Sequence, residues 1–177
     1  MELVDLSKFQ IMDLLNLSTE WAKNEVFSTR FFILFAILFF IASMGFWQLG
    51  KTDLAKAYTI PTSIAATLLL IIGLGLFYTN KSRIRQFNEE YNTNSISFYE
   101  SELKRTESTL KEYKVVFKVI PILIIIAALL ILFFNSTTIR AISITTIAML
   151  IIVLLIDGTA HSRLEFYNKS LKELNTK

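Results

Sequence analysis

Four long apolar runs without a charged residue constrain the fold of this chain more than any other feature. They cover residues 31–50, 57–80, 119–139 and 141–156, and they are 20, 24, 21 and 16 residues long. A helix rises 1.5 Å per residue, so about 20 residues cross a hydrocarbon layer of about 30 Å. Each run must be helical, because backbone amides find no water inside a bilayer. The fourth run reaches the required length if it extends to about residue 160, with Asp157 directed toward the headgroups.

Composition favours a membrane protein over a soluble one. Hydrophobic residues make up 53% of the 177 residues and charged residues only 19%, whereas soluble domains carry about 25% charged residues. Four such runs leave too little polar surface for a soluble helical protein. The first run is a retained span rather than a signal peptide, because no small-residue cleavage pattern follows Gly50. The sequence therefore predicts an all-α, polytopic membrane protein with four transmembrane helices and a cytoplasmic helical bundle.

The distribution of Lys and Arg predicts the orientation of the four spans. Of the 18 Lys and Arg residues, 15 lie before the first run, between the second and third runs, or after the fourth. The other three are Lys51, Lys56 and Arg140, in two short connections on the opposite side. The positive-inside rule then places both termini and the central segment in the cytoplasm.

The segments outside the spans carry helical patterns of their own. Residues 1–26 predict an amphipathic helix, on which one face gathers Leu3, Leu6, Ile11, Leu14, Leu17 and Trp21. Such a helix lies on the membrane surface or packs on partner helices, and its excess of acidic residues favours packing. Residues 27–80 and 119–160 form the two transmembrane hairpins of this interpretation, and residues 161–177 form a cytoplasmic C-terminal helix with an apolar stripe at Leu164, Tyr167, Leu171 and Leu174.

The central segment, residues 81–118, predicts a cytoplasmic helical loop with a polar break at 92–95. Ser97 and Glu100 then have the spacing of a capping box. A heptad stripe with one polar member, Thr106, follows the break, and its apolar members are Tyr99, Leu103, Leu110, Tyr113 and Phe117. These five residues are candidates for an oligomer seam. Two interpretations stay open: the stripe packs within one subunit, or it assembles subunits.

No recognisable catalytic pattern is present. The chain has no Cys and a single His, which excludes disulfides and multi-histidine metal sites. It contains no phosphate-binding loop or hydrolase motif. The neighbouring acidic residues Glu89-Glu90 and Glu100/Glu102 are interpreted as solvated helix faces. No span carries a charge near its middle, which argues against a proton- or sodium-coupled carrier. We therefore expect a protein that is not an enzyme and that binds no cofactor, no metal and no nucleic acid directly.

One polar group at the inner end of the fourth span is a candidate pore mouth. Asp157 and His161 are four residues apart and share a helix face, and Arg163 is close by in the sequence. A ring of such groups around a central axis would attract ions and respond to pH. The alternative interpretation is a headgroup-level cluster that marks the membrane boundary.

Part of the central segment resembles known bacterial proteins. Residues 97–105, Ser-Phe-Tyr-Glu-Ser-Glu-Leu-Lys-Arg, and residues 118–121, Lys-Val-Ile-Pro, are similar to a family of uncharacterised bacterial four-span proteins. The overall layout also resembles the small membrane accessory proteins of type VI-B CRISPR systems. That resemblance implies the bacterial inner membrane, a functional link to an RNA-guided nuclease, and membrane pores that strengthen antiviral defence. The Arg-x4–6-His ribonuclease motif linked to those proteins is absent, since the nearest Arg before His161 is Arg140.

The leading hypothesis is a non-enzymatic, homo-oligomeric membrane protein that forms a pore in the lipid bilayer by self-association. A second hypothesis is a membrane anchor, scaffold or regulator for a cytoplasmic partner, without conductance. A third is a membrane-bound ribonuclease-like protein that uses His161.

Overall fold

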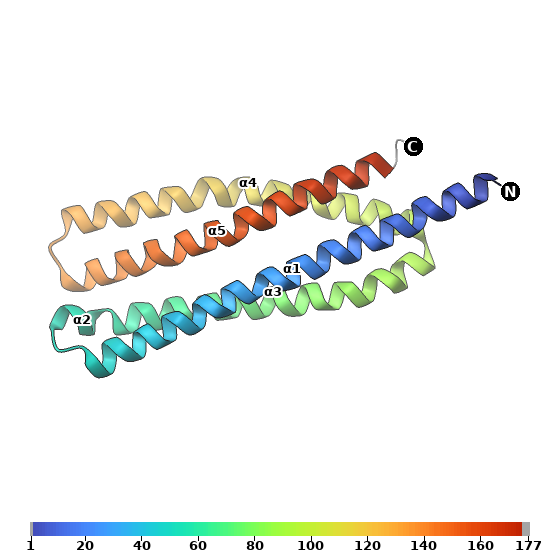
Figure 1. Cartoon of the computed structure of the whole chain (residues 1–177). Helices are drawn as coiled ribbons and strands as arrows, with labels where there is room; N and C mark the ends of the chain where they lie inside the picture. The colour runs from blue at the N-terminus through green and yellow to red at the C-terminus, as the bar shows by residue number, and fades with distance from the viewer. Residues whose placement is uncertain (1, 175–177) are drawn as a thin grey trace.

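The computed structural model describes residues 2–174, with side chains from residue 13 onward. The described chain is all-helical, with the element order α1 (Glu2–Leu49), α2 (Asp53–Ala57), α3 (Thr59–Thr93), α4 (Ser95–Phe133) and α5 (Thr137–Leu174) (Figure 1). Within these residues, four helices are long and apolar enough to cross a membrane. This confirms the predicted all-α class and the four candidate spans.

The long helices form two antiparallel hairpins that lie side by side (Figure 1). α1 packs on α3, α4 packs on α5, and α5 joins the hairpins through contacts with α1 and α3. The start of α1, the end of α5 and the α3–α4 connection lie at one end of the bundle, which we call the termini end (residues 13–30, 81–118 and 161–174). The opposite end carries α2 and the α4–α5 connection, and we call it the α2 end.

The segments outside the spans are direct extensions of the transmembrane helices. α1 continues through residues 1–26 into the first span without a break, starting from Glu2; the side chains of Leu3, Leu6 and Ile11 lie outside the described residues. Likewise α5 runs from the α2 end as far as Leu174. The first and fourth spans therefore continue without a helix break into the termini end.

The break between α3 and α4 lies where the sequence predicts it, but the cap differs. Asn94 has extended backbone geometry, and its side-chain oxygen accepts hydrogen bonds from the amides of Ile96 and Ser97 at 3.1 and 3.0 Å. The prediction that Ser97 caps the helix is wrong, because Asn94 is an equally good capping residue and α4 begins directly after it. Ser97 and Glu100 lie inside the first turns of α4.

The α2 end is closed by a short helix that the sequence did not predict. The Thr52 hydroxyl accepts a hydrogen bond from the Ala55 amide at 3.2 Å and so caps α2. The Ser43 hydroxyl of α1 donates to the Thr59 carbonyl at 2.8 Å, which fixes the start of α3 against α1. Pro61 sits in the first turn of α3, where no amide donor is needed.

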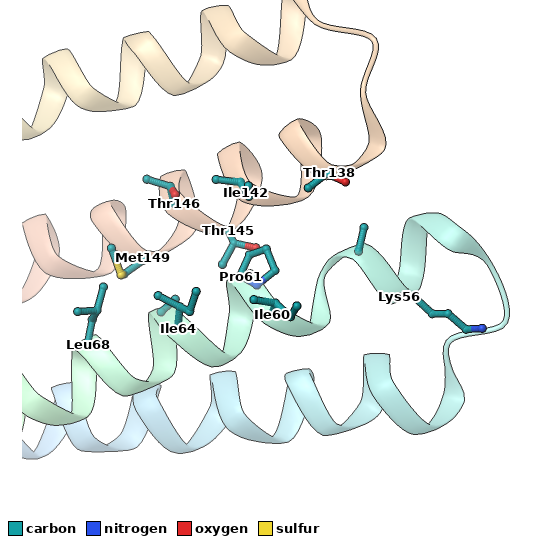
Figure 2. Close-up of a pocket in the computed structure, with 12 residues that line it drawn as sticks. Lys56, Ile60, Pro61, Ile64, Leu68, Thr138, Ile142, Thr145, Thr146 and Met149 are labelled. Carbon is teal, nitrogen blue, oxygen red and sulfur yellow. The ribbon is translucent and has the colours of Figure 1, made fainter.

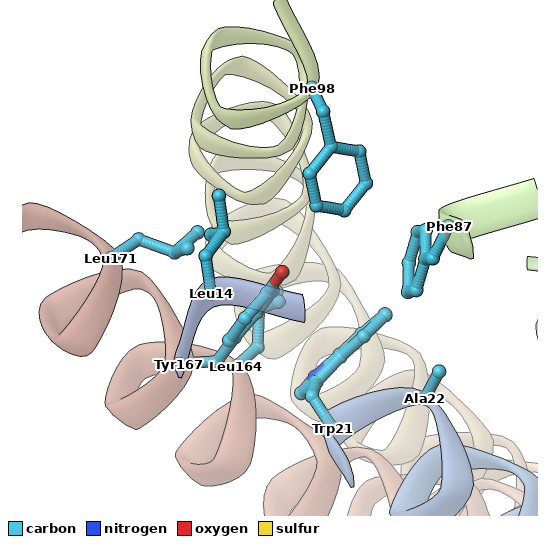
Figure 3. Close-up of a cluster of buried hydrophobic side chains, with 8 residues drawn as sticks. All are labelled: Leu14, Trp21, Ala22, Phe87, Phe98, Leu164, Tyr167 and Leu171. Atoms are coloured by element: carbon cyan, nitrogen blue, oxygen red, sulfur yellow. The ribbon is translucent and has the colours of Figure 1, made fainter. Parts of the chain in front are cut away.

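Two apolar clusters hold the bundle together. The larger lies at the termini end and contains the buried residues Leu14, Trp21, Ala22, Phe87, Phe98, Leu164, Tyr167 and Leu171 (Figure 3). The smaller lies inside the spans and consists of Phe32, Ala36, Leu69 and Ile156. Gly73 makes the close α1–α3 contact near it possible, since a Cβ there would lie 2.9 Å from the Cβ of Phe32.

Candidate functional site

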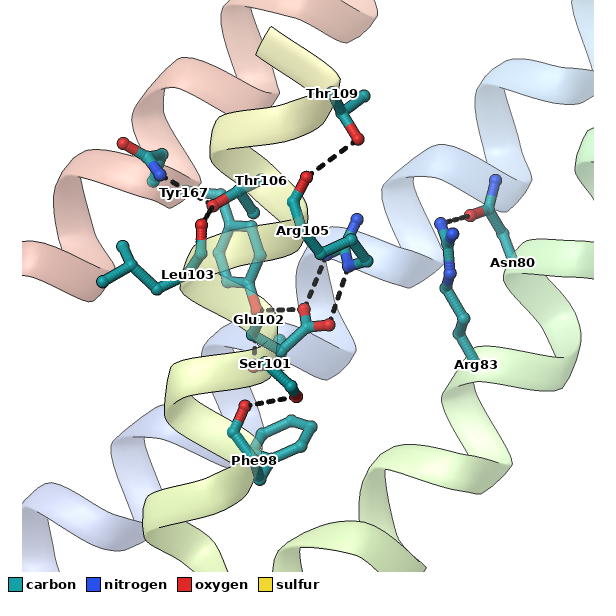
Figure 4. Close-up of polar contacts among 12 residues, drawn as sticks. Asn80, Arg83, Phe98, Ser101, Glu102, Leu103, Arg105, Thr106, Thr109 and Tyr167 are labelled. Carbon is teal, nitrogen blue, oxygen red and sulfur yellow. Dashed lines mark hydrogen bonds and ion pairs between the residues drawn. The ribbon is translucent and has the colours of Figure 1, made fainter. Parts of the chain in front are cut away.

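A buried polar network connects three helices at the termini end (Figure 4). The Tyr167 hydroxyl of α5 lies 2.8 Å from a carboxylate oxygen of Glu102 on α4 and 2.7 Å from the Ser18 hydroxyl of α1. Arg105 donates two hydrogen bonds to the two oxygens of Glu102, at 2.7 and 2.6 Å. Glu102, Tyr167 and Ser18 are all buried. The network thus ties α1, α4 and α5 together at one point.

The direction in which each hydroxyl donates its proton explains why this arrangement is stable. The single Tyr167 proton goes to the Glu102 carboxylate, because a charged acceptor makes the stronger bond. The Ser18 hydroxyl donates its own proton to the Leu14 carbonyl, 2.8 Å away, and presents its oxygen to the Tyr167 hydroxyl. Burial, reinforced by the charge of Glu102, raises the pKa of Tyr167 well above its ordinary value. Tyr167 therefore remains a protonated donor at every physiological pH.

The Trp21 ring packs against two members of the network, Tyr167 and Arg105. The rings of Trp21 and Tyr167 stack at 5.2 Å between centroids, with 11° between their planes. On Trp21 the Arg105 guanidinium lies 4.3 Å from the ring centroid, which is close enough for a cation–π interaction. Arg105 thus contacts an acid and an aromatic ring at once, a combination that the planar guanidinium allows and a Lys ammonium would not reproduce.

Two further polar contacts surround the network. Asn168 donates to the Thr106 hydroxyl at 2.7 Å, which joins α5 to α4 a second time. Arg163 lies 3.0 Å from Glu25, which joins α5 to α1. Burial raises the pKa of Glu25 above its ordinary value, although the neighbouring Arg163 opposes the shift.

These contacts hold helices together. Glu102 accepts three hydrogen bonds within the network, two from Arg105 and one from Tyr167. Among the described residues, no cluster of His, Cys, Asp and Glu is placed to hold a metal ion. The network is best understood as a polar lock that fixes the two hairpins in one register.

The three predicted pore-mouth residues all lie on α5, near its passage into the termini end. Arg163 pairs with Glu25 of α1. His161 lies edge-on to the rings of Tyr113 and Phe117 on α4, at 5.4 and 5.3 Å, and approaches Glu165 at 3.8 Å. Asp157 is half-buried one turn earlier on α5. The ring of such groups around a central axis stays a prediction.

The predicted seam residues pack inside the chain. Four of the five lie against the apolar cluster at the termini end, namely Tyr99, Leu103, Leu110 and Tyr113. Phe117 stacks on Tyr113 at 6.0 Å and contacts His161. This placement favours the first of the two interpretations, in which the stripe builds one subunit.

Sequence reasoning missed the polar lock. It treated Glu102 as part of a solvated face, which is wrong, because Glu102 is only 4% exposed. The buried face of α4 runs through Phe98, Glu102 and Thr106 at a spacing of four. The sequence did contain a signal for this burial. Glu102 has an aromatic residue four positions before it and Thr106, the one polar member of the stripe, four positions after it. Arg105, three positions on, is a partner for its charge.

Comparison with known proteins adds no assignment: no family model, curated protein or solved structure matches the chain. Its function is therefore argued from its own geometry.

Proposed function

We propose that the chain forms a homo-oligomer in the membrane, and that the oligomer encloses a pore. The polar lock supports this proposal by making each subunit a rigid unit that joins its spans to the termini end. The observation that carries it is the placement of three glycines. Gly45, Gly75 and Gly158 lie inside α1, α3 and α5, and a Cβ on any of them would meet nothing within 4 Å.

These glycines have no packing reason within one chain. Glycine in a helix interior costs about 1 kcal/mol relative to alanine. Gly73 offsets that cost through the close contact with Phe32, whereas Gly75 and Gly158 make no such contact. In membranes, small residues let helices of different subunits approach closely. The open glycines therefore support helix contacts between copies.

Two of the glycines lie at a similar depth. Gly73 adjoins Phe32, and Ile156 belongs to the same cluster as Phe32. Gly75 and Gly158 are each two residues further toward the termini end on helices that run in the same direction. They are thus placed to form one layer of intersubunit contacts, near the level of Asp157.

Bulky substitution tests the assembly. The Gly75→Leu and Gly158→Leu variants should fold, because their Cβ positions are open, but they should run as smaller species on sizing in mild detergent. Ile125→Phe, which enlarges an exposed residue of α4, a span without an open glycine, is the matched control and should leave the size unchanged. A wild type that already runs as a monomer would contradict the proposal.

The anchor or scaffold alternative is favoured by a different observation. Val115 and Phe166 are 60% and 69% exposed at the termini end, outside the spans. Exposed apolar residues beyond the spans suit a protein partner. The two functions differ in permeability: a pore releases a dye from vesicles, while a scaffold reconstituted in the same orientation does not. The link to an RNA-guided nuclease rests on the sequence resemblance alone and stays a prediction.

A further inference from the structure

A groove opens between the two hairpins near the α2 end (Figure 2). It has a volume of about 400 Å³ and lies between α3 and α5. Its walls are largely apolar and include Ile60, Pro61, Ile64, Leu68, Thr145 and Met149. The volume falls within the range of small-molecule sites, about 300–1,000 Å³.

The groove spans the depth of one membrane leaflet. On α3 its lining extends from Ile60 to Leu68, and on α5 from Thr138 to Met149. At 1.5 Å per residue these stretches are about 12 and 16 Å long. One leaflet of a hydrocarbon layer of about 30 Å measures about 15 Å. An apolar chain that enters at the α2 end would therefore fill the groove to the middle of the bilayer.

One buried threonine lies in the groove wall. Thr145 is only 6% exposed. Figure 2 shows it between α5 and α3, beside Pro61.

The mouth of the groove carries positive charge. Lys56 lines it, and Figure 2 shows the Lys56 side chain at the open end, directed away from the groove interior. In the two connections at this end, residues 50–58 and 134–140, three cations, Lys51, Lys56 and Arg140, face one acid, Asp53. Cations at this level attract anionic lipid headgroups.

We propose that the groove is a lipid-binding site for an anionic phospholipid of the leaflet at the α2 end. One acyl chain lies between α3 and α5, along Ile64, Leu68 and Met149. The phosphate lies at the mouth, at the level of the cations Lys51, Lys56 and Arg140. A helix of a second copy is the competing occupant, but the match to leaflet depth and the cationic mouth favour the lipid. The proposal is independent of pore formation.

Photo-crosslinking of the unmodified protein tests the site. The chain is reconstituted in vesicles that contain a phosphatidylglycerol probe with a diazirine in its acyl chain. Adducts are expected on residues 60–68 and 138–149, and competition by unlabelled phosphatidylglycerol should be about fivefold stronger than by phosphatidylcholine. Adducts spread evenly over lipid-facing residues of all four spans would overturn the proposal.

Variants separate the lipid from a second copy. Ile64→Phe and Thr146→Phe narrow the groove at half-buried or exposed positions, and each should lower the retained phosphatidylglycerol at least tenfold in native mass spectrometry. Ile151→Phe, on α5 outside the groove, is the matched control and should retain the lipid. Lys56→Gln should remove the preference for phosphatidylglycerol, whereas Lys51→Gln should preserve most of it. The assignment would be wrong if the narrowed variants kept the lipid. It would also be wrong if they dissociated into smaller oligomers while lipid retention stayed constant.

Discussion

The hydroxyl of Tyr167 lies 2.8 Å from the carboxylate of Glu102, although 65 residues separate the two in the chain. Glu102 is bound at the same time by Arg105, and Arg105 covers the Trp21 ring of α1. A buried acid is costly unless it is paired and hydrogen-bonded. Arg105 of α4 and Tyr167 of α5 bind Glu102 directly, and their own contacts with Trp21 and Ser18 of α1 link the acid to the other hairpin.

Removal of the Tyr167 hydroxyl should weaken the lock. In Tyr167→Phe, buried Glu102 loses one donor while the ring stack on Trp21 remains, so the free energy of unfolding should fall by about 1–3 kcal/mol. Thermal unfolding in detergent measures the change. Tyr78→Phe, at a ring that is 68% exposed, should unfold at the wild-type temperature. An unchanged Tyr167→Phe would show that the network contributes nothing to stability.

Removing one partner of the Glu102–Arg105 ion pair should destabilise the fold more than replacing both partners. Arg105→Leu leaves Glu102 buried without a countercharge, which should destabilise the chain by about 3–5 kcal/mol. The double variant Glu102→Leu/Arg105→Leu should recover most of that loss, because an apolar pair of similar volume carries no desolvation penalty. Chemical unfolding in mixed micelles provides the comparison. A double variant as unstable as the single one would mean that the charges do not act as a pair.

Glu25 predicts a specific pH dependence. Burial raises its pKa in the folded chain above the ordinary value of 4.5. Its contribution to stability is therefore fully present below pH 4.5 and is lost as the pH rises through the folded pKa. The melting temperature should show this fall, and Glu25→Gln should remove it. Glu100→Gln, at an exposed position on α4, should retain the fall; if Glu25→Gln retained it equally, Glu25 would not be its source.

The orientation can be tested because the chain has no native cysteine. Single cysteines at Ile96, which is 72% exposed at the termini end, and at Lys51 of the opposite end report the two sides. A membrane-impermeant thiol reagent added to intact cells should label Lys51→Cys and spare Ile96→Cys, since the termini end carries most of the Lys and Arg. The reverse pattern would place the termini outside the cytoplasm.

The span pattern was predictable from local sequence, whereas the lock was not. Uncharged runs of about 20 residues define the spans, and the polar stretch around Asn94 marks the break between α3 and α4. The stripe from Leu164 to Leu171 was identified as well, because its spacing is that of a helix face. Glu102, in contrast, is buried through Tyr167 and Ser18, which are distant in sequence. The four-residue spacing of Phe98, Glu102 and Thr106 indicates a shared face, but helical periodicity carries no information about which distant residues pair with the acid.

The central claim, that copies of this chain enclose a pore, is tested most directly by release of a small dye from vesicles that contain the purified protein. The account predicts release from wild-type vesicles and a strong reduction for Gly75→Leu and Gly158→Leu at equal insertion, with Ile125→Phe as active as wild type. Vesicles that hold correctly inserted wild-type protein and retain their dye would contradict it.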